Sequence, residues 1–336
     1  MIHSESHAYA FVAAVCIGHN GIFVTLDVFK KEGFTIKPLL DLKDPGLRKI
    51  GKLIVPAIIG LSATQINIFI NTNFASRCAE GSVAWLNYAF RLMQFPIGLF
   101  GVALSVATLP LVARQATRGE LDKLGDTYVS SLILAFLLTV PAAIGLWILS
   151  EPIISLIFQH GRFSSFDTLM TGQALKFYSI GLMAYSAVKI IVPIYYALDD
   201  TRWPVIASFI SVVLNIIIIL LTLEKFQHRA IALSTSLTII FNFVFLSIIL
   251  YKKMGGYPIA RFFSALVKII IASSLMGLGV AYVNSLFESS SSIFPLLIQV
   301  GTGVFVGVCI YLGALLILRM KEARDMAEAI LLKLKG

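Results

Sequence analysis

Long apolar segments recur along this chain, and they constrain its fold more than any other feature. A segment of about 18 or more residues with few charges is long enough to cross the hydrocarbon core of a membrane. Of the 336 residues, 58% are hydrophobic and only 13% are charged, which leaves little polar sequence for a separate soluble domain. The sequence therefore predicts an all-α, polytopic membrane helical bundle. We predict about nine spans, at 8–29, 53–76, 83–110, 127–149, 166–197, 203–223, 229–250, 262–286 and 293–318.

The positive charges between these spans predict the orientation. Nineteen of the 27 Lys and Arg residues fall in the loops of one side, and four fall in the loops of the other. Basic residues concentrate in cytoplasmic loops, so we expect the N-terminus outside and the C-terminus in the cytoplasm. The stretch 150–165 is too short to span and is predicted as an interfacial turn or extension. Residues 319–335 are predicted as a short amphipathic helix on the membrane surface.

Several classes of function are excluded by the same composition. The net charge of +9 resides in short loops, and no aromatic-basic motif accompanies it, so we expect no nucleic-acid partner. The five histidines and three cysteines lack metal-ligand spacing, and Asp199-Asp200 lacks the spaced carboxylates of magnesium-diphosphate enzymes. We expect no metal, no cofactor and no catalytic residues.

Arg91 is the most informative polar residue. It lies about eight residues inside its predicted span, about 12 Å deep. A central arginine costs at least about 2.5–3.5 kcal/mol in hydrocarbon, so its side chain should face water or a partner. Because a guanidinium binds phosphate in a bidentate manner, an anion such as a diphosphate is the expected ligand. The alternative is a side chain that reaches the headgroups.

Lys189 is the second candidate. It lies about eight residues from the cytoplasmic end of its span and four residues before Pro193. A proline leaves the carbonyl four residues earlier without its helical donor, so the backbone of Lys189 needs a polar neighbour as well. We expect Lys189 to line a cavity, with a side chain that reaches the cytoplasmic surface as the alternative.

Amides form a polar ladder in the second span: Gln65, Asn67, Asn71 and Asn73. Asn67 and Asn71 are four residues apart and share a helix face. Asn87, Asn215, Asn242 and Thr235 occur in later spans. Amides between membrane helices more often hold the helices together, at about 0.6 kcal/mol each, than bind ligands.

Several strings of residues together resemble one family. They are Asp44-Pro45-Gly46-Leu47-Arg48, Pro56 to Asn67, Gly81-Ser82, Tyr88 to Pro96, Gly98 to Ala103, Phe158 to Phe163, Lys189 to Ala197 and Asp200 to Pro204. On these strings the chain resembles the lipid II flippases of the MurJ (MviN) family, within the multidrug/oligosaccharidyl-lipid/polysaccharide exporter superfamily. The likeness runs from about residue 8 to 253, and more loosely to the end.

The resemblance implies an architecture and an activity. Family members have fourteen helices, in two six-helix lobes and a final pair that forms a lipid-tail groove. They move undecaprenyl-diphosphate-linked peptidoglycan precursor (lipid II) across the bacterial inner membrane by alternating access. On this pattern we expect a leading helix in 1–30 like the family's sixth, a cytoplasmic linker in 31–52, a second lobe in 53–253, the groove pair in 254–320 and a cytoplasmic segment in 321–336. The chain then looks like a fragment that lacks the first five helices.

The same resemblance assigns candidate site residues. Arg91 matches a cavity arginine and Lys189 a cavity lysine, and we add Asn67 and Gln94 as further substrate-binding candidates. Some members bind a cation through acids near the positions of Asn71 and Ile219, beside Asn215 and Thr235. Those acids are absent here, so Asn71, Asn215 and Thr235 are at most a candidate cation site. Phe90 and Gln94 stand where many members have acids beside the arginine.

Two rival functions remain open from the sequence. The chain could serve a flippase or exporter for another lipid-linked glycan or a drug, or it could be a non-transporting subunit of envelope assembly. The expected partners are lipid II and membrane lipids, together with the missing N-terminal lobe or cell-wall synthases.

Overall fold

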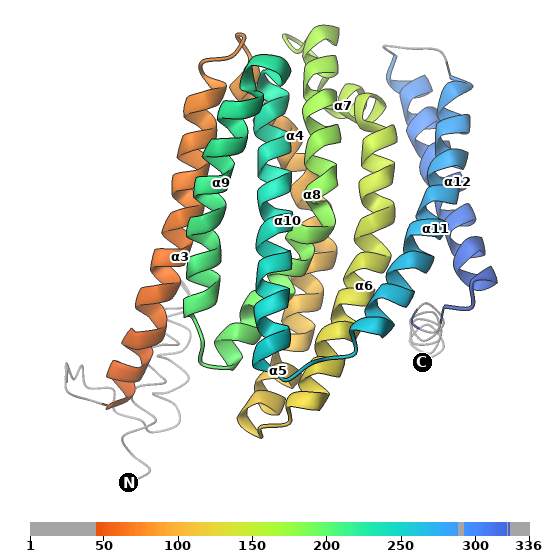
Figure 1. The fold of residues 1–336 in the computed structure, drawn as a ribbon. Coiled ribbons are helices and arrows are strands. Elements are labelled where there is room, and N and C mark those ends of the chain that lie inside the picture. The colour runs from red at the N-terminus through yellow and green to blue at the C-terminus, as the bar shows by residue number, and fades with distance from the viewer. Residues whose placement is uncertain (1–44, 288–291, 321, 323–336) are drawn as a thin grey trace, which may run out of the picture. The chain divides into compact units, whose positions relative to one another are not determined.

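The architecture comes from a computed structural model, which describes residues 45–287, 292–320 and 322. Every element that it describes is helical, which confirms the predicted class. The chain divides into two compact units, residues 1–59 and 60–336, and the second unit holds the helix bundle. Its elements are α3 (Pro45–Ala75), whose first residues lie in the other unit, α4 (Ser82–Pro96), η1 (Ile97–Val102), α5 (Ala103–Thr117), α6 (Leu121–Ile148), α7 (Ser150–Phe158), α8 (Ser165–Ala197), α9 (Arg202–Phe226), α10 (His228–Lys253), α11 (Ile259–Ser285) and α12 (Ile293–Ile317) (Figure 1).

The observed helices follow the predicted spans closely. In the part of the chain that the structure describes, seven continuous helices are long and apolar enough to cross a membrane. They are Ser82–Thr117, which joins α4, η1 and α5, and then α6, α8, α9, α10, α11 and α12. The predicted span 53–76 falls on α3, whereas the predicted span 8–29 and most of the segment 319–335 lie outside the described residues. The chain is therefore a multi-pass membrane protein.

Contacts at the helix ends agree with the prediction that successive loops lie on alternate sides of the membrane. Lys253 forms an ion pair with Asp200, which joins the α8–α9 connection to the end of α10. At the opposite ends of these helices, Trp85 of α4 contacts His228, the first residue of α10. We call this second region the α7 end, because α7 lies there (Figure 1). The predicted interfacial stretch 150–165 contains α7 itself, which an ion pair from Glu151 to Lys176 joins to α8 at 2.7 Å.

Helix α8 is the centre of the second unit, with α4, α6, α7 and α10 packed around it (Figure 1). Its 33 residues begin at a capping box, in which Ser164 and Asp167 bond reciprocally to each other's backbone amides. The capping box satisfies amides that would otherwise lack partners at a helix start. Small residues let neighbouring helices approach α8: a Cβ on Gly101 would lie 3.0 Å from Ser186, and one on Gly181 would lie 2.9 Å from Ser236. These contacts bring η1 and α10 close to α8.

At two prolines inside helices, a hydroxyl group from another helix donates to the carbonyl that the proline leaves without its helical donor. Pro141 in α6 leaves the Leu137 carbonyl free, and the Tyr311 hydroxyl of α12 donates to that carbonyl at 2.6 Å. Pro193 in α8 leaves the Lys189 carbonyl free, and the Ser105 hydroxyl of α5 donates to it at 2.6 Å. A third proline, Pro96, ends α4 and is followed directly by the π-helical turn η1. Such π turns are frequent at functional sites.

Candidate functional site

Arg91 lies on an exposed side of the continuous helix α4–η1–α5. Its side chain is exposed, and within the described residues no hydrogen bond or ion pair reaches its guanidinium. We call the exposed side that continues from it the open face, formed by Arg91, Phe95, Leu99, Val102 and Val106. Apart from Arg91 the side chains of this face are apolar, while the exposed Asn87 and Gln94 lie about one helical turn before and after Arg91. The structure thus places Arg91 outside the packed core of the bundle.

Gln94 is also exposed and lies three residues after Arg91 on α4. Residues three apart on a helix are neighbours, so the amide and the guanidinium can reach one ligand. Gln94 supplies both a donor and an acceptor, and it leaves the arginine charge uncompensated.

Lys189 is exposed on α8, and the structure describes no ion pair to its ammonium group. Its backbone carbonyl is the one that accepts from Ser105. The sequence predicted this carbonyl to need a polar neighbour but did not identify Ser105. In the sequence, Ser105 stands out only as a hydroxyl residue in an apolar span, which does not connect it to Lys189.

The two cations do not lie at one level of the bundle. Lys189 is level with Ser105, to which its carbonyl is bonded, and Ser105 follows Arg91 by fourteen residues on one continuous helix. At 1.5 Å per residue, that separation is about 20 Å along the helix axis. To contact one diphosphate group together in this conformation, the Arg91 and Lys189 side chains would have to extend toward each other.

Asn67, Asn71, Asn215 and Thr235 are brought together from α3, α9 and α10, and we call them the polar junction. The Asn215 amide donates to Asn67 Oδ1 at 2.6 Å and to Asn71 Oδ1 at 2.7 Å. The Asn71 amide in turn donates to the Thr235 hydroxyl at 3.1 Å, and that hydroxyl donates to the Ile231 carbonyl at 2.7 Å. The three residues of the candidate cation site are thus adjacent, and the substrate candidate Asn67 is bonded to them rather than to Arg91 or Gln94.

The chemistry of the polar junction is neutral. All four side chains are uncharged, and Ile219, where the resemblance implies an acid, is fully buried. One buried atom of the junction, Asn215 Oδ1, has no hydrogen-bond partner among the residues that the structure describes. Across the residues that the structure describes, no cluster of three or more His, Cys, Asp or Glu side chains is arranged to hold a metal ion. The junction has the oxygen atoms of a cation site without the negative charge that usually holds the ion.

Comparison with known proteins identifies the family. The family model described as "Lipid II flippase MurJ" matches residues 2–301. The chain belongs to the MurJ family. A curated "Probable lipid II flippase MurJ" from Buchnera aphidicola subsp. Acyrthosiphon pisum is 36% identical over 249 residues, which are 73% of this chain and 48% of that protein. The "Lipid II flippase MurJ" of Burkholderia cenocepacia is 35% identical over 208 residues, 60% of this chain and 40% of that protein.

Solved structures agree with the MurJ assignment. The chain superposes on a lipid II flippase MurJ in an inward closed conformation with a TM-score of 0.66 and 27% identity, covering 91% of this chain and 60% of that one. A multidrug resistance MATE family transporter in an outward-facing conformation matches with a TM-score of 0.54 at 20% identity, which is a likeness of fold alone. The chain spans about half the length of the curated MurJ relatives that it matches.

Proposed function

We propose that this chain supplies the second lobe and the lipid groove of a transporter that moves lipid II across the bacterial inner membrane by alternating access. The observation that carries the proposal is Arg91, an exposed and unpaired guanidinium on a membrane-spanning helix of a MurJ family member. A charge in that position needs water and an anion to offset its desolvation. The diphosphate of lipid II is an anion of the required geometry.

In this proposal Arg91 and Gln94 bind the diphosphate together, at either the first or the last stage of transport. Lys189 binds it at a different stage. The separation of about 20 Å along the helix axis favours contact with one cation at a time in the present conformation. Two separated cations on a path give a ligand successive binding positions, which suits a transporter that must release its cargo. A single site at which both cations hold the diphosphate would bind it more tightly and release it more slowly.

The organisation of the chain follows from the same proposal. Residues 53–253 would form the second lobe and 254–320 the groove pair, preceded by a helix in 1–30 and a linker in 31–52, with a cytoplasmic segment in 321–336. The contact of α11 with both α6 and α12 is consistent with such a pair. The distribution of basic residues supports placing the α7 end outside the cell and the C-terminus in the cytoplasm.

We further propose that the polar junction holds α3, α9 and α10 together and that transport does not depend on sodium. Its side chains already donate to one another, and none carries the negative charge that a sodium ion would need. Membrane amides in this role contribute about 0.6 kcal/mol for each hydrogen bond.

The test is leaflet-resolved transport by the full-length protein in liposomes. Lipid II should move between leaflets, while a polyprenyl-diphosphate that carries an unrelated glycan should move at least about tenfold more slowly. Equal movement of both lipids would favour a flippase of broader specificity. No movement of either lipid, combined with co-purification of cell-wall synthases, would favour an assembly subunit and would overturn the proposal.

A further inference from the structure

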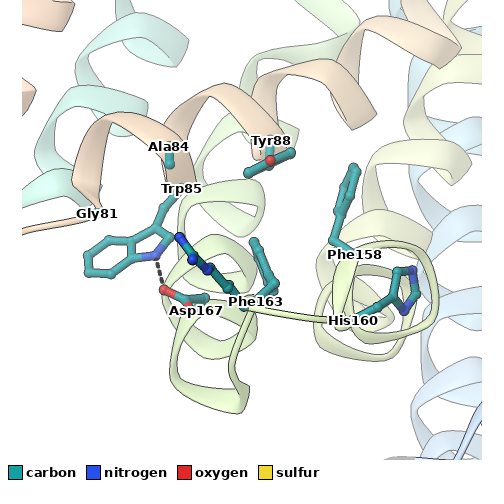
Figure 2. A pocket seen from close by; sticks show the side chains of 9 residues that line it. Gly81, Ala84, Trp85, Tyr88, Phe158, His160, Phe163 and Asp167 are labelled. Carbon is teal, nitrogen blue, oxygen red and sulfur yellow. Dashed lines mark hydrogen bonds between the residues drawn. The ribbon is translucent and has the colours of Figure 1, made fainter.

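A hollow lined by aromatic side chains lies at the α7 end. Its volume is about 380 Å³, at the small end of the range of about 300–1,000 Å³ typical of small-molecule sites. Figure 2 shows Tyr88, Phe158 and Phe163 around this hollow, with Trp85 and Asp167 on one side and His160 on the other. The lining is completed by Gly81, Ala84 and Arg162. We call this hollow the aromatic pocket.

Three aromatic rings form one wall of the aromatic pocket. The Tyr88 ring centroid lies 4.7 Å from that of Phe158 and 5.5 Å from that of Phe163, and the latter two lie 6.2 Å apart. All three side chains are only partly buried, so ring surface remains available to a ligand. Aromatic faces are negative, and they attract the weakly positive C–H groups on the face of a sugar ring.

The opposite wall is held rigid by Trp85. Its indole Nε1 donates to Asp167 Oδ1 at 2.7 Å, while Asp167 Oδ2 accepts from the Ser164 amide and hydroxyl. Trp85 also packs edge-on against Phe166 and His228. Gly81 has a φ of +94°, and a Cβ there would lie 2.7 Å from the indole ring. A wall that is already ordered loses little entropy when a ligand binds.

Polar groups at the rim are free to bind a ligand. In the part of the chain that the structure describes, no partner bonds to the exposed Arg162 guanidinium or to the Tyr88 hydroxyl. His160 Nε2 contacts the Ile157 carbonyl at 2.7 Å, which leaves its second ring nitrogen available. An arginine fork matches a carboxylate or a phosphate, and hydroxyl and carboxylate oxygens accept from sugar hydroxyls.

The aromatic pocket adjoins Arg91. Tyr88 precedes Arg91 by three residues on α4, so the two side chains lie one helical turn apart. A diphosphate at Arg91 would therefore place the group attached to it within reach of the pocket. In a lipid-linked glycan that group is a sugar.

We propose that the aromatic pocket binds the anionic glycopeptide of the lipid II headgroup, with a sugar ring on Tyr88 and Phe163 and a carboxylate on Arg162. This rests on the proposed function, and it makes the α7 end the place where the headgroup is received after transport. A glycan fits better than a phospholipid headgroup, because the rings line an open hollow against which a pyranose can stack and Asp167 offers an acceptor for hydroxyls.

The test uses a probe without diphosphate, the soluble disaccharide pentapeptide, added to the full-length protein in nanodiscs. Trp147, Trp203 and every tryptophan of the full-length protein outside this sequence are replaced by Phe so that fluorescence reports Trp85 alone. We expect saturable binding that Phe163→Leu weakens about 3–10-fold and Arg162→Gln about 10-fold. Arg77→Gln is the matched control, because Arg77 is another exposed arginine before Gly81 and lies outside the pocket lining; it should bind as the parent does.

Three results separate the explanations. Arg91→Ala should still bind the probe, so a loss of transport in Arg91→Ala and a loss of probe binding in Arg162→Gln report different sites. Unfolding midpoints of the pocket variants, if unchanged, exclude a general loss of structure, and Arg162→Lys should recover part of the binding. Equal probe binding by parent, Phe163→Leu and Arg162→Gln would overturn the proposal, as would competition by phosphatidylglycerol vesicles or inorganic phosphate but not by the glycopeptide.

Discussion

Two polar regions of this membrane protein differ in where their polar groups find partners. In the polar junction, the buried amide of Asn215 bonds to both Asn67 and Asn71, and Asn71 bonds on to Thr235. Arg91 on the open face and Lys189 on α8 carry full charges and have no side-chain partner among the described residues. Among the described residues, the junction pairs its amide donors internally and leaves Asn215 Oδ1 without a partner, whereas the charges are left for water and a ligand.

The difference indicates which polar residues to associate with stability and which with transport. A polar group that is bonded inside the bundle stabilises helix packing when present and destabilises it when removed. A charge that is exposed on a membrane helix adds little to stability, and its presence there points to a ligand. Four substitutions and one change of ion test this division, from the largest expected effect to the smallest.

Arg91→Ala should abolish transport with little effect on folding. In a strain depleted of its own flippase, the full-length variant should fail to restore growth at normal expression. Arg91→Lys should be partly active, because an ammonium group cannot make the bidentate contact. Arg118→Ala, which removes an exposed arginine after α5, is the matched control and should grow normally. Normal growth of the strain that carries Arg91→Ala would show that the open face takes no part in transport.

Asn215→Leu should destabilise the bundle by about 1–3 kcal/mol, because it removes two hydrogen bonds and leaves the oxygens of Asn67 and Asn71 unpaired. Reversible unfolding in detergent would measure this change. Asn87→Leu is the control, since among the described residues the exposed Asn87 amide donates to the Val83 carbonyl of its own helix and to no other helix. If both variants unfold at the same denaturant concentration, the junction does not hold the helices together.

Tyr311→Phe should destabilise the protein by about 1–2 kcal/mol, because the buried Leu137 carbonyl opposite Pro141 then has no donor. Transport per folded molecule should stay close to the parent value, since this contact lies between α12 and α6, away from Arg91 and Lys189. A large loss of transport with unchanged unfolding would show that this joint moves during transport.

Ser105→Ala should reduce transport more than stability, which is the reverse of the result expected for Tyr311→Phe. It removes the donor to the Lys189 carbonyl, but Lys189 is exposed and water can replace the hydroxyl, so the loss of stability should stay below about 1 kcal/mol. Transport should fall about 2–5-fold, because the backbone that orients Lys189 loosens, and Ser105→Thr should restore it. Unchanged transport in Ser105→Ala would leave Ser105 with a packing role alone.

Replacing sodium by potassium at constant ionic strength should have the smallest effect, with transport rates equal within about 20% if the neutral junction binds no cation. A severalfold dependence on sodium would show that the unpaired Asn215 Oδ1 is a cation ligand. The variant Ile219→Asp, which adds a carboxylate beside Asn215, provides the positive control for sodium binding.

The sequence predicted the helices well because apolar length is a local property. The predicted spans 166–197 and 293–318 differ from α8 and α12 by one residue at most. The expectation that Arg91 faces water or an anion also rests on a local argument, the cost of a charge in hydrocarbon, and it stays a prediction.

Contacts between helices that are distant in the sequence could not be predicted from such local properties. Pro193 predicted a free carbonyl at Lys189, yet nothing local selected Ser105, 84 residues away, as its donor. The ion pair between Lys176 of α8 and Glu151 of α7 is another such contact, because neither segment indicates the other as its partner. The aromatic pocket could not be predicted, because its residues come from separate segments and none of these segments signals a pocket by itself.

The most direct test of the central claim is the affinity of the purified full-length protein for undecaprenyl diphosphate, which carries the anion without the glycopeptide. If the guanidinium of Arg91 binds the diphosphate, Arg91→Ala should weaken binding about 10–100-fold, while Asn215→Leu, measured below its unfolding transition, should bind as the parent does. Equal affinity of the parent and Arg91→Ala would contradict the account.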